Sequence, residues 1–137
     1  MIHKFRAWDK NQQIMRGVRC LFWTKNNLVA HCSPIGDKFD KFFTTILNDG
    51  EYHLMQSTGL LDKNDREIFE GDLLRDSESI VIVKFKDGEF IVDYRNMVGE
   101  WRNYGSLFSY LKDFEGEVIG DIYQNPELLE VEDDTKV

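Results

Sequence analysis

The sequence of 137 residues is poor in cysteine, proline and basic side chains: it has two cysteines, two prolines, and 17 lysine or arginine residues against 25 acidic ones. Two cysteines cannot build the disulfide framework that holds small secreted domains together. Few prolines and 42% hydrophobic residues indicate an ordered chain. No stretch reaches the roughly 20 apolar residues that cross a bilayer, and residues 1–13 are too polar for a signal-peptide core. We therefore expect an ordered protein with one core, which stays in the cytoplasm and does not associate with membranes.

The deficit of positive charge also limits the partners. The formal net charge is −8, whereas binding to a phosphate backbone normally needs a positive surface that releases counterions. Part of the excess negative charge lies in the last residues, 130–137, which we expect to be solvated. The composition therefore disfavours general nucleic-acid binding.

Residues 80–94 contain the clearest local signal. The pair Asp87-Gly88 separates two runs of β-branched and aromatic residues, which predicts a hairpin with a two-residue turn. The predicted pairs on the core face are Val81 with Tyr94, Val83 with Val92 and Phe85 with Phe90; those on the other face are Ile82 with Asp93, Lys84 with Ile91 and Lys86 with Glu89.

A second hairpin is predicted around Asn26-Asn27, with strands over residues 18–25 and 28–33. Its expected core face carries Leu21, Trp23, Leu28, Ala30 and Cys32, and its other face carries Cys20, Phe22, Val29 and His31.

Other elements follow from shorter patterns. Further strands are expected over residues 4–8, 52–56, 67–75 and 117–123. The spacing of Leu107, Tyr110, Leu111 and Phe114 predicts a short helix with Ser106 as its cap and Gly116 as its end. Residues 39–47 fit a helix and a strand equally, and Pro126 suits a terminal helical turn that carries Leu128 and Leu129 back onto the sheet. The sequence thus predicts a mainly β fold, a small barrel or a sandwich, with one or two short helices.

Four motifs agree in order and spacing with those of one protein family. They read KFRAWD from Lys4, LMQSTGL from Leu54, DKN from Asp62 with EIFEGD from Glu67, and VIGDIYQNPELL from Val118. On these motifs the chain resembles the YopX family of phage and prophage proteins. Family members commonly have an Asn-Gly turn and a tyrosine in the central motif, where this chain has Asp65 and Phe69. Aspartate tolerates the left-handed conformation, and phenylalanine keeps the apolar role.

The resemblance implies a single YopX-like domain over residues 1–137. Its family-like parts are residues 1–24 and 54–129, with a variable insert at about 25–50 and an acidic tail at 130–137.

The resemblance also implies a mainly β protein encoded by mobile genetic elements, which acts in the host cytoplasm and has no agreed biochemical activity. The motif residues that we interpret as structural are Trp8, Gly59, Glu70, Gly71, Asp72, Gly120, Tyr123, Asn125 and Pro126. Gly71-Asp72 is expected to form a bulge or tight bend, which resembles a bend in small SH3-like barrels.

Candidate chemistry is sparse. The predicted register places Cys20 and Cys32 on opposite faces, so we expect two free, packed thiols. It places Cys20 and His31 diagonally on one face, but two residues make neither a structural zinc site nor an oriented catalytic dyad. Glu67, Glu70 and Asp72 lie close together, yet carboxylates in an acidic protein are more often solvated or capping groups. The sequence therefore predicts no enzyme activity, no metal ligand and no cofactor.

Aromatic residues indicate where a partner could bind. Trp101, Arg102 and Tyr104 form the best candidate interaction surface. The leading hypothesis is a non-enzymatic phage or prophage accessory protein that binds another protein, or its own copies, through the β domain. The alternatives are a small nucleic-acid-binding barrel, which the net charge disfavours, and an acidic, DNA-like inhibitor of a host nucleic-acid enzyme.

Overall fold

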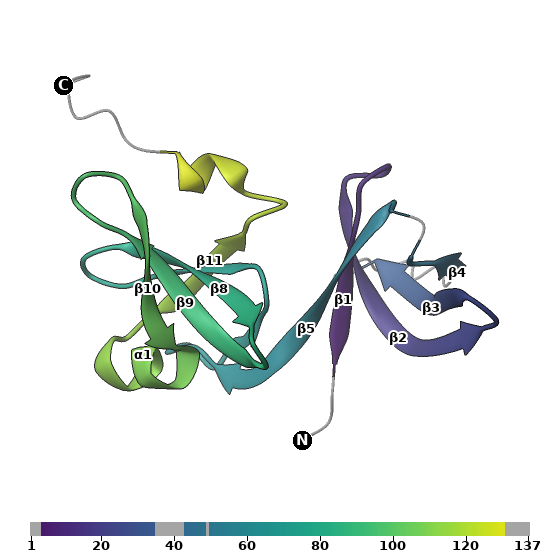
Figure 1. Ribbon diagram of the computed structural model, residues 1–137, viewed down its shortest axis with the longest axis horizontal. Coiled ribbons are helices and arrows are strands. Elements are labelled where there is room, and N and C mark those ends of the chain that lie inside the picture. The colour runs from purple at the N-terminus through teal and green to yellow at the C-terminus, as the bar shows by residue number, and fades with distance from the viewer. Residues whose placement is uncertain (1–3, 35–42, 49, 131–137) are drawn as a thin grey trace. The chain divides into compact units, whose positions relative to one another are not determined.

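The computed structural model describes residues 4–34, 43–48 and 50–130 and divides the chain into two compact units (Figure 1). The first unit runs from Met1 to Gly59 and the second from Leu60 to Val137. Each unit is a continuous stretch of sequence, so the chain passes from one to the other once. That passage follows Gly59, an exposed residue with a left-handed φ of +77°.

The first unit is built from antiparallel strands. They are β1 (Phe5–Asp9), β2 (Ile14–Thr24), β3 (Asn27–Pro34), β4 (Phe43–Ile46) and β5 (Tyr52–Leu61). The last two residues of β5, Leu60 and Leu61, already belong to the second unit. Their order is β4-β3-β2-β1-β5, and β6 (Glu67–Phe69) follows β5 at the other end of the same sheet. Ala7, Ala30, Cys32 and Leu47 form its buried apolar cluster. Of the ambiguous segment 39–47, residues 43–46 are a strand, and residues 39–42 lie outside the described residues.

The β2–β3 hairpin turns one residue earlier than predicted. Thr24 pairs with Asn27, and Lys25 in the turn takes a left-handed φ of +45°. Each residue of β2 therefore pairs two positions earlier on β3 than predicted, so that Trp23 is opposite Leu28 and not Ala30. Because side chains alternate with a period of two, the residues predicted to share a face still share it. Trp23, however, is 67% exposed and not part of the core. The reason is that β1 pairs with β2 only as far as Val18, so the end of the hairpin extends past its neighbour.

The second unit holds the five-stranded antiparallel sheet. Its strands are β7 (Asp72–Arg75), β8 (Ile80–Lys86), β9 (Glu89–Arg95), β10 (Trp101–Ser106) and β11 (Glu117–Asp121), in the order β10-β9-β8-β7-β11. The expected strand over residues 67–75 is interrupted, because Gly71 turns the chain with a left-handed φ of +88° between β6 and β7. The strand β10 was not predicted.

The register predicted for residues 80–94 is confirmed at all six pairs. Val81, Val83 and Val92 are buried on the core face. Phe85 is 47% exposed, against expectation, because it lies beside the turn at the end of the hairpin. It packs against Phe90 with ring centroids 4.9 Å apart.

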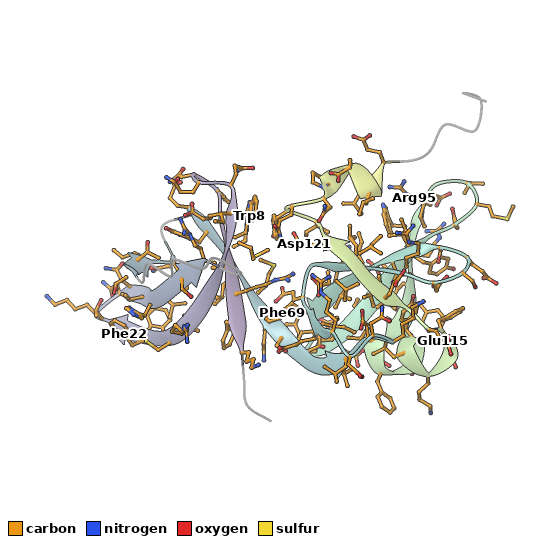
Figure 2. All side chains as sticks on the ribbon, turned by 180° about the vertical axis from the view of Figure 1, so that it is seen from behind. Trp8, Phe22, Phe69, Arg95, Glu115 and Asp121 are labelled. Atoms are coloured by element: carbon orange, nitrogen blue, oxygen red, sulfur yellow. The ribbon has the colours of Figure 1, made fainter. Side chains whose placement is uncertain are left out.

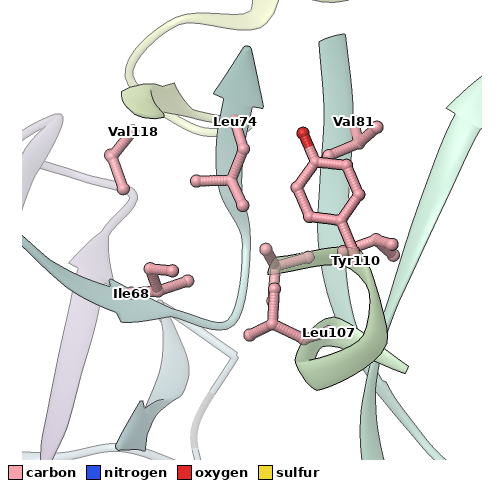
Figure 3. Packing of buried hydrophobic residues seen from close by; sticks show 8 residues of the cluster. Ile68, Leu74, Val81, Leu107, Tyr110 and Val118 are labelled. Atoms are coloured by element: carbon pink, nitrogen blue, oxygen red, sulfur yellow. The ribbon is translucent and has the colours of Figure 1, made fainter. Parts of the chain in front are cut away.

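The helix α1 (Leu107–Asp113) begins as predicted, with the Ser106 hydroxyl accepting from the Ser109 N–H at 3.0 Å. Its last residue is Asp113 and its C-cap is Phe114, whereas Gly116 was expected as its end. Leu107 and Tyr110 point from the helix into the cluster that includes Ile68, Leu74 and Val81 (Figure 3). Each unit therefore has its own hydrophobic cluster, whereas the composition had suggested one core.

A 3-10 helix, η1 (Pro126–Leu129), forms the predicted terminal turn. Leu128 and Leu129 are half-buried in it. The expectation of a mainly β fold is confirmed, and neither sheet closes into a barrel within the residues described. In the same residues, no helix has both the length and the apolar character needed to span a bilayer.

Candidate interaction surface

The loop between β9 and β10 is held by a single asparagine. The Asn96 carboxamide oxygen accepts from the N–H of Val98 at 3.1 Å and from that of Glu100 at 2.9 Å. The Asn96 N–H donates to the Glu100 carbonyl at 2.8 Å, and the Gly99 N–H donates to the Asn96 carbonyl at 3.0 Å. Gly99 completes the turn with a left-handed φ of +85°. Four hydrogen bonds therefore fix the backbone of this loop.

The same loop presents two apolar side chains to solvent. Met97 is fully exposed and Val98 is 76% exposed. Together they are named here the apolar tip. Isolated surface hydrophobes are common, whereas these two adjacent residues form a small apolar patch.

Trp101 lies at the base of this loop, where it pairs with Arg95 across the two strands. The Arg95 guanidinium carbon is 4.7 Å from the centre of the Trp101 ring, a cation–π distance. Arg95, which is labelled in Figure 2, also donates a hydrogen bond to the Leu129 carbonyl of η1. The indole is thus held in place from one side and remains half-exposed.

The other two residues of the candidate surface lie elsewhere on β10. Arg102 pairs with Tyr94, so it is on the opposite face from Trp101. Arg102 forms an exposed ion pair with Glu100 at 2.5 Å. The Tyr104 ring packs edge-on against Tyr110, at 6.0 Å between centroids. Trp101 therefore does not form one surface with Arg102 and Tyr104. It lies instead next to the loop that carries the apolar tip.

Asp62, the first residue of the DKN motif, is 5% exposed, and its carboxylate accepts hydrogen bonds from three backbone N–H groups. Its Oδ1 accepts from the N–H of Asn64 and of Arg66, and its Oδ2 accepts from the N–H of Val118, each at 2.8 Å. Burial alone raises the pKa of Asp62, but the three backbone donors outweigh it and hold that pKa below the ordinary value. The carboxylate is therefore stabilised in its charged form and joins the 62–66 turn to β11.

The carboxylates of Asp72 and Asp121 also accept hydrogen bonds from backbone N–H groups, in the turn before β7 and in the turn after β11. Asp72 accepts from the Phe69 N–H at 2.8 Å. Asp121 accepts from the N–H of Tyr123 at 2.9 Å and of Gln124 at 2.8 Å. Both are 2% exposed. Of the three carboxylates that lie close together in the sequence, Asp72 is buried, and Glu67 and Glu70 are half-buried.

The remaining motif residues differ in burial. Trp8, Gly71 and Asp72 are buried, Glu70, Gly120, Tyr123 and Asn125 are half-buried, and Gly59 and Pro126 are exposed. Asp65 takes a left-handed φ of +63°, the conformation that we expected this residue to tolerate in the turn.

Both cysteines are free, as expected. Cys32 is buried, but Cys20 is exposed, so the expectation of two packed thiols is wrong for Cys20. Cys20 lies directly opposite His31 and not diagonal to it, because the hairpin turns one residue earlier than predicted. The register shift between Val18 and Cys20, which adds Arg19 to β2, lies beyond this pair. The His31 ring also contacts the Thr44 hydroxyl at 3.3 Å. Within the described part of the chain, no three His, Cys, Asp or Glu residues are placed to hold a metal ion.

Two shallow hollows in the second unit mix both signs of charge. One, of about 380 Å³, is lined by Lys84, Lys86, Asp87, Glu89, Ile91, Asp93 and Asn103. The other, of about 370 Å³, is lined by Lys63, Arg75, Asp76, Ser77, Asp113, Phe114, Glu115 and Glu117. Lys84 in the first forms an ion pair with Asp93 at 2.9 Å. Neither hollow is a continuous basic track or an uninterrupted acidic face.

The described residues define a mainly β protein of two antiparallel sheets with an apolar loop tip. Comparison with known proteins then gives the family. The family model described as YopX protein matches residues 4–130, and the chain belongs to that family. The resemblance inferred from the four motifs is confirmed, and the match runs through both units. The assignment of residues 1–137 to a single domain stays a prediction.

Two relatives illustrate the match. The SPbeta prophage-derived uncharacterized protein YopX of Bacillus subtilis (strain 168) is 38% identical over 63 residues, which are 41% of this chain and 40% of that protein. The chain therefore aligns with about two fifths of that curated relative's length. The crystal structure of protein EF1440 from Enterococcus faecalis is similar with a TM-score of 0.66 and 30% identity, covering 95% of this chain and 99% of that one.

Proposed function

We propose that this chain is a non-enzymatic phage or prophage accessory protein that acts in the host cytoplasm by binding another protein. The apolar tip, Met97 and Val98, enters an apolar pocket of that partner, and Trp101 packs at its edge. The observation that carries the proposal is the exposure of both tip residues on a loop whose backbone is already fixed.

A fixed loop favours binding because little conformational entropy is lost when it docks. Burying an exposed Met or Val side chain contributes roughly 1.5–3 kcal/mol each. Trp and Arg residues, such as the cation–π pair of Trp101 and Arg95, are frequent among the residues that dominate binding energy.

A protein partner is favoured over the alternatives by charge. The net charge of −8 opposes binding to anionic lipid surfaces and to phosphate backbones. The lysines of the first hollow alternate with Asp87, Glu89 and Asp93, which does not favour a nucleic-acid interface. The acids of the second hollow are accompanied by Lys63 and Arg75, which does not favour a DNA-like surface.

The hydrogen bonds that the motif carboxylates accept from the backbone support a non-enzymatic role. Asp62, Asp72 and Asp121 each accept hydrogen bonds from backbone N–H groups of adjacent turns. A general acid or base needs a proton that it can release or accept near the working pH. The lowered pKa of Asp62 is opposite to the shift that a general acid requires.

The test compares capture by three forms of the full chain from lysates of cells that carry the parent element. The forms are the wild type, the double variant Met97→Ser with Val98→Ser, and the control Phe108→Ser, which removes a 61% exposed aromatic from α1. We expect the wild type and the control to retain the same protein and the tip variant to lose it.

The captured protein is then purified and titrated against all three forms. We expect the tip variant to bind at least about tenfold more weakly, with the control unchanged. Equal affinities for the tip variant and the wild type would refute the proposed surface. Circular dichroism checks that each variant is folded.

A further inference from the structure

The formal charge is divided unevenly between the two units. Residues 1–59 contain eight lysine or arginine residues and five acidic ones, whereas residues 60–137 contain nine and twenty. The first unit therefore has a formal net charge of +3 and the second a formal net charge of −11. Because the value of −8 for the whole chain adds opposite signs, it does not describe the surface of the first unit.

The exposed charges of the first unit are mostly positive. Within its described residues, 4–34, 43–48 and 50–59, the exposed charged side chains are four basic ones and one acidic one: Lys4, Lys10, Arg19, Lys25 and Glu51. Asp9, the other acid in these ranges, is 2% exposed and forms an ion pair with Arg16 at 3.2 Å. The sequence from residue 10 to residue 36 contains no acidic residue at all. This part of the surface therefore attracts anions.

The end of the β2–β3 hairpin carries exposed aromatic side chains among these cations. The hairpin extends past β1, with which β2 pairs only as far as Val18 (Figure 1). Trp23 is 67% exposed, and Phe22, which is labelled in Figure 2, is 44% exposed. Tryptophan is highly buried on average, so an indole with this exposure indicates a contact surface.

Basic residues lie on both sides of the indole along the hairpin. Arg19 is the additional residue at the register shift between Val18 and Cys20, and Lys25 lies in the turn. Both are exposed.

Lys4 adds a third cation. It directly precedes Phe5, the partner of Val18, so Lys4 and Arg19 are the next residues on their two strands. The Lys4 carbonyl accepts from the Ser57 N–H at 2.7 Å, which fixes the backbone there.

We infer that the exposed end of the β2–β3 hairpin binds single-stranded nucleic acid, with a base stacked on the Trp23 ring and phosphates beside Arg19 and Lys25. Proteins that bind single strands without reading their sequence combine a positive groove with aromatic side chains on which bases stack. A single strand is favoured over a duplex because its bases are free to stack. It is favoured over an acidic peptide because carboxylates pair with the cations but offer no ring to the indole.

The negative charge of the whole chain is compatible with this site. At physiological ionic strength the Debye length is about 8 Å, so a bound phosphate interacts mainly with the charges in its immediate surroundings. Along the hairpin the charged residues on either side of Trp23 are Arg19 and Lys25, and both are positive.

This inference is independent of the proposed binding of a protein by the apolar tip, because it concerns the other unit. Fluorescence anisotropy of the full chain is measured with labelled single-stranded DNA, single-stranded RNA and duplex DNA of about 20 nucleotides per strand. We expect one of the single strands to bind at least about tenfold more tightly than the duplex. For three neutralised phosphates, the slope of log K against log salt should be about −2.

The DNA and RNA arms show which kind of strand is preferred, and tight binding of either supports the inference. A wild type that binds no strand at about 50 mM salt, or that binds duplex and single strands equally, would overturn it and leave the apolar tip untouched. The double variant of the apolar tip should bind the strand like the wild type.

Two charge variants with the same net charge locate the site. Lys25→Glu changes the hairpin turn, and the control Lys112→Glu changes an exposed lysine in the last turn of α1. We expect Lys25→Glu to weaken binding at least about tenfold and to reduce the salt slope, whereas Lys112→Glu binds like the wild type. Equal weakening by both variants would show that only the net charge acts and would overturn the hairpin site.

Two substitutions at Trp23 test the stacking. Trp23→Ser should weaken binding at least about fivefold, whereas Trp23→Phe keeps an aromatic ring and should retain most of the affinity. The control Phe108→Ser removes a 61% exposed aromatic from the second unit and should leave binding unchanged. Wild-type affinity in Trp23→Ser would refute the stacking, and circular dichroism checks that each variant is folded.

Competition distinguishes a nucleic acid from an acidic protein. Polyglutamate with the same number of negative charges as the single strand is added to the complex. We expect it to displace the strand at least about tenfold less effectively than unlabelled strand, because it does not stack on the indole. Equal competition would show that the hairpin recognises charge alone and would overturn nucleic acid as its ligand.

Discussion

The carboxamide of Asn125 occupies the space beside Gly120 where any larger residue would place its β-carbon. A β-carbon on Gly120 would lie 2.3 Å from Asn125 Oδ1 and 3.0 Å from Asn125 Cβ. The carboxamide cannot move away freely, because Oδ1 accepts from the Asp121 N–H at 3.2 Å. The Asn125 N–H also donates to the Asp121 carbonyl at 2.9 Å. Glycine at 120 and asparagine at 125 therefore depend on one another.

Gly120→Ala should reduce the free energy of unfolding by about 1–3 kcal/mol through overpacking. Asn125→Ala alone should cost about 1 kcal/mol, because it removes the acceptor for the Asp121 N–H. The double variant should lose less than the sum of the two, since it removes the clash. Urea unfolding of all four proteins measures the coupling; strict additivity would contradict the geometry.

Asp62→Asn should lower the free energy of unfolding at about pH 7 by about 1–3 kcal/mol, because an amide oxygen cannot replace a carboxylate that accepts three backbone N–H groups. The folded-state pKa of Asp62 is lowered, so its contribution is present above the unfolded pKa and disappears as pH falls through the folded value. The difference between wild type and variant should therefore shrink from about pH 7 to about pH 2. A difference that is constant over this range would contradict the assignment.

The two cysteines should differ in reactivity. Burial raises the pKa of the Cys32 thiol to about 11, and the nearby Arg16 charge lowers it only in part. Cys20 is exposed. An aromatic disulfide reagent at about pH 8 should therefore label one thiol in the folded protein and the second only in urea. Cys20→Ser is the control, and it should show no rapid labelling. Two thiols reacting at equal rates in the folded protein would refute the burial of Cys32.

Asp65→Gly should stabilise the chain by about 0.5 kcal/mol, because Asp65 has φ of +63°, a conformation that glycine adopts without a steric cost. Asp65→Ala at the same position should destabilise it by about 1 kcal/mol. Thermal unfolding of both variants beside the wild type measures the order of the three. An alanine variant at least as stable as the glycine variant would contradict a left-handed residue in this turn.

Where turn chemistry and strand alternation agree, the sequence was enough to predict the register. Asp87-Gly88 defines the turn, and the alternation on either side places Val83 opposite Val92. The Asn26-Asn27 turn was misplaced by one residue because two adjacent asparagines suit either position, and only the structure puts Lys25 in the left-handed conformation. The strand β10 was missed because Asn103 and Gly105 interrupt any alternation, and it is held by pairing with β9.

The interaction surface could be predicted only in part. Trp101 was selected for its aromatic ring, and it does lie at the base of the β9–β10 loop. Met97 and Val98 were not selected, because apolar residues in sequence normally indicate burial and their exposure depends on tertiary packing. Asn96 and Gly99 signal a turn, but the loop geometry that exposes the two side chains follows from hydrogen bonds that sequence does not specify.

The division after Gly59 has a consequence for synthesis on the ribosome. The pairings of β1 with β2, β1 with β5, β2 with β3 and β3 with β4 all join residues that precede Leu60. The first unit can therefore complete these ladders while the later half of the polypeptide is still being translated. The nascent chain need not wait for its C-terminal residues, which shortens the time during which unpaired strands are exposed to aggregation.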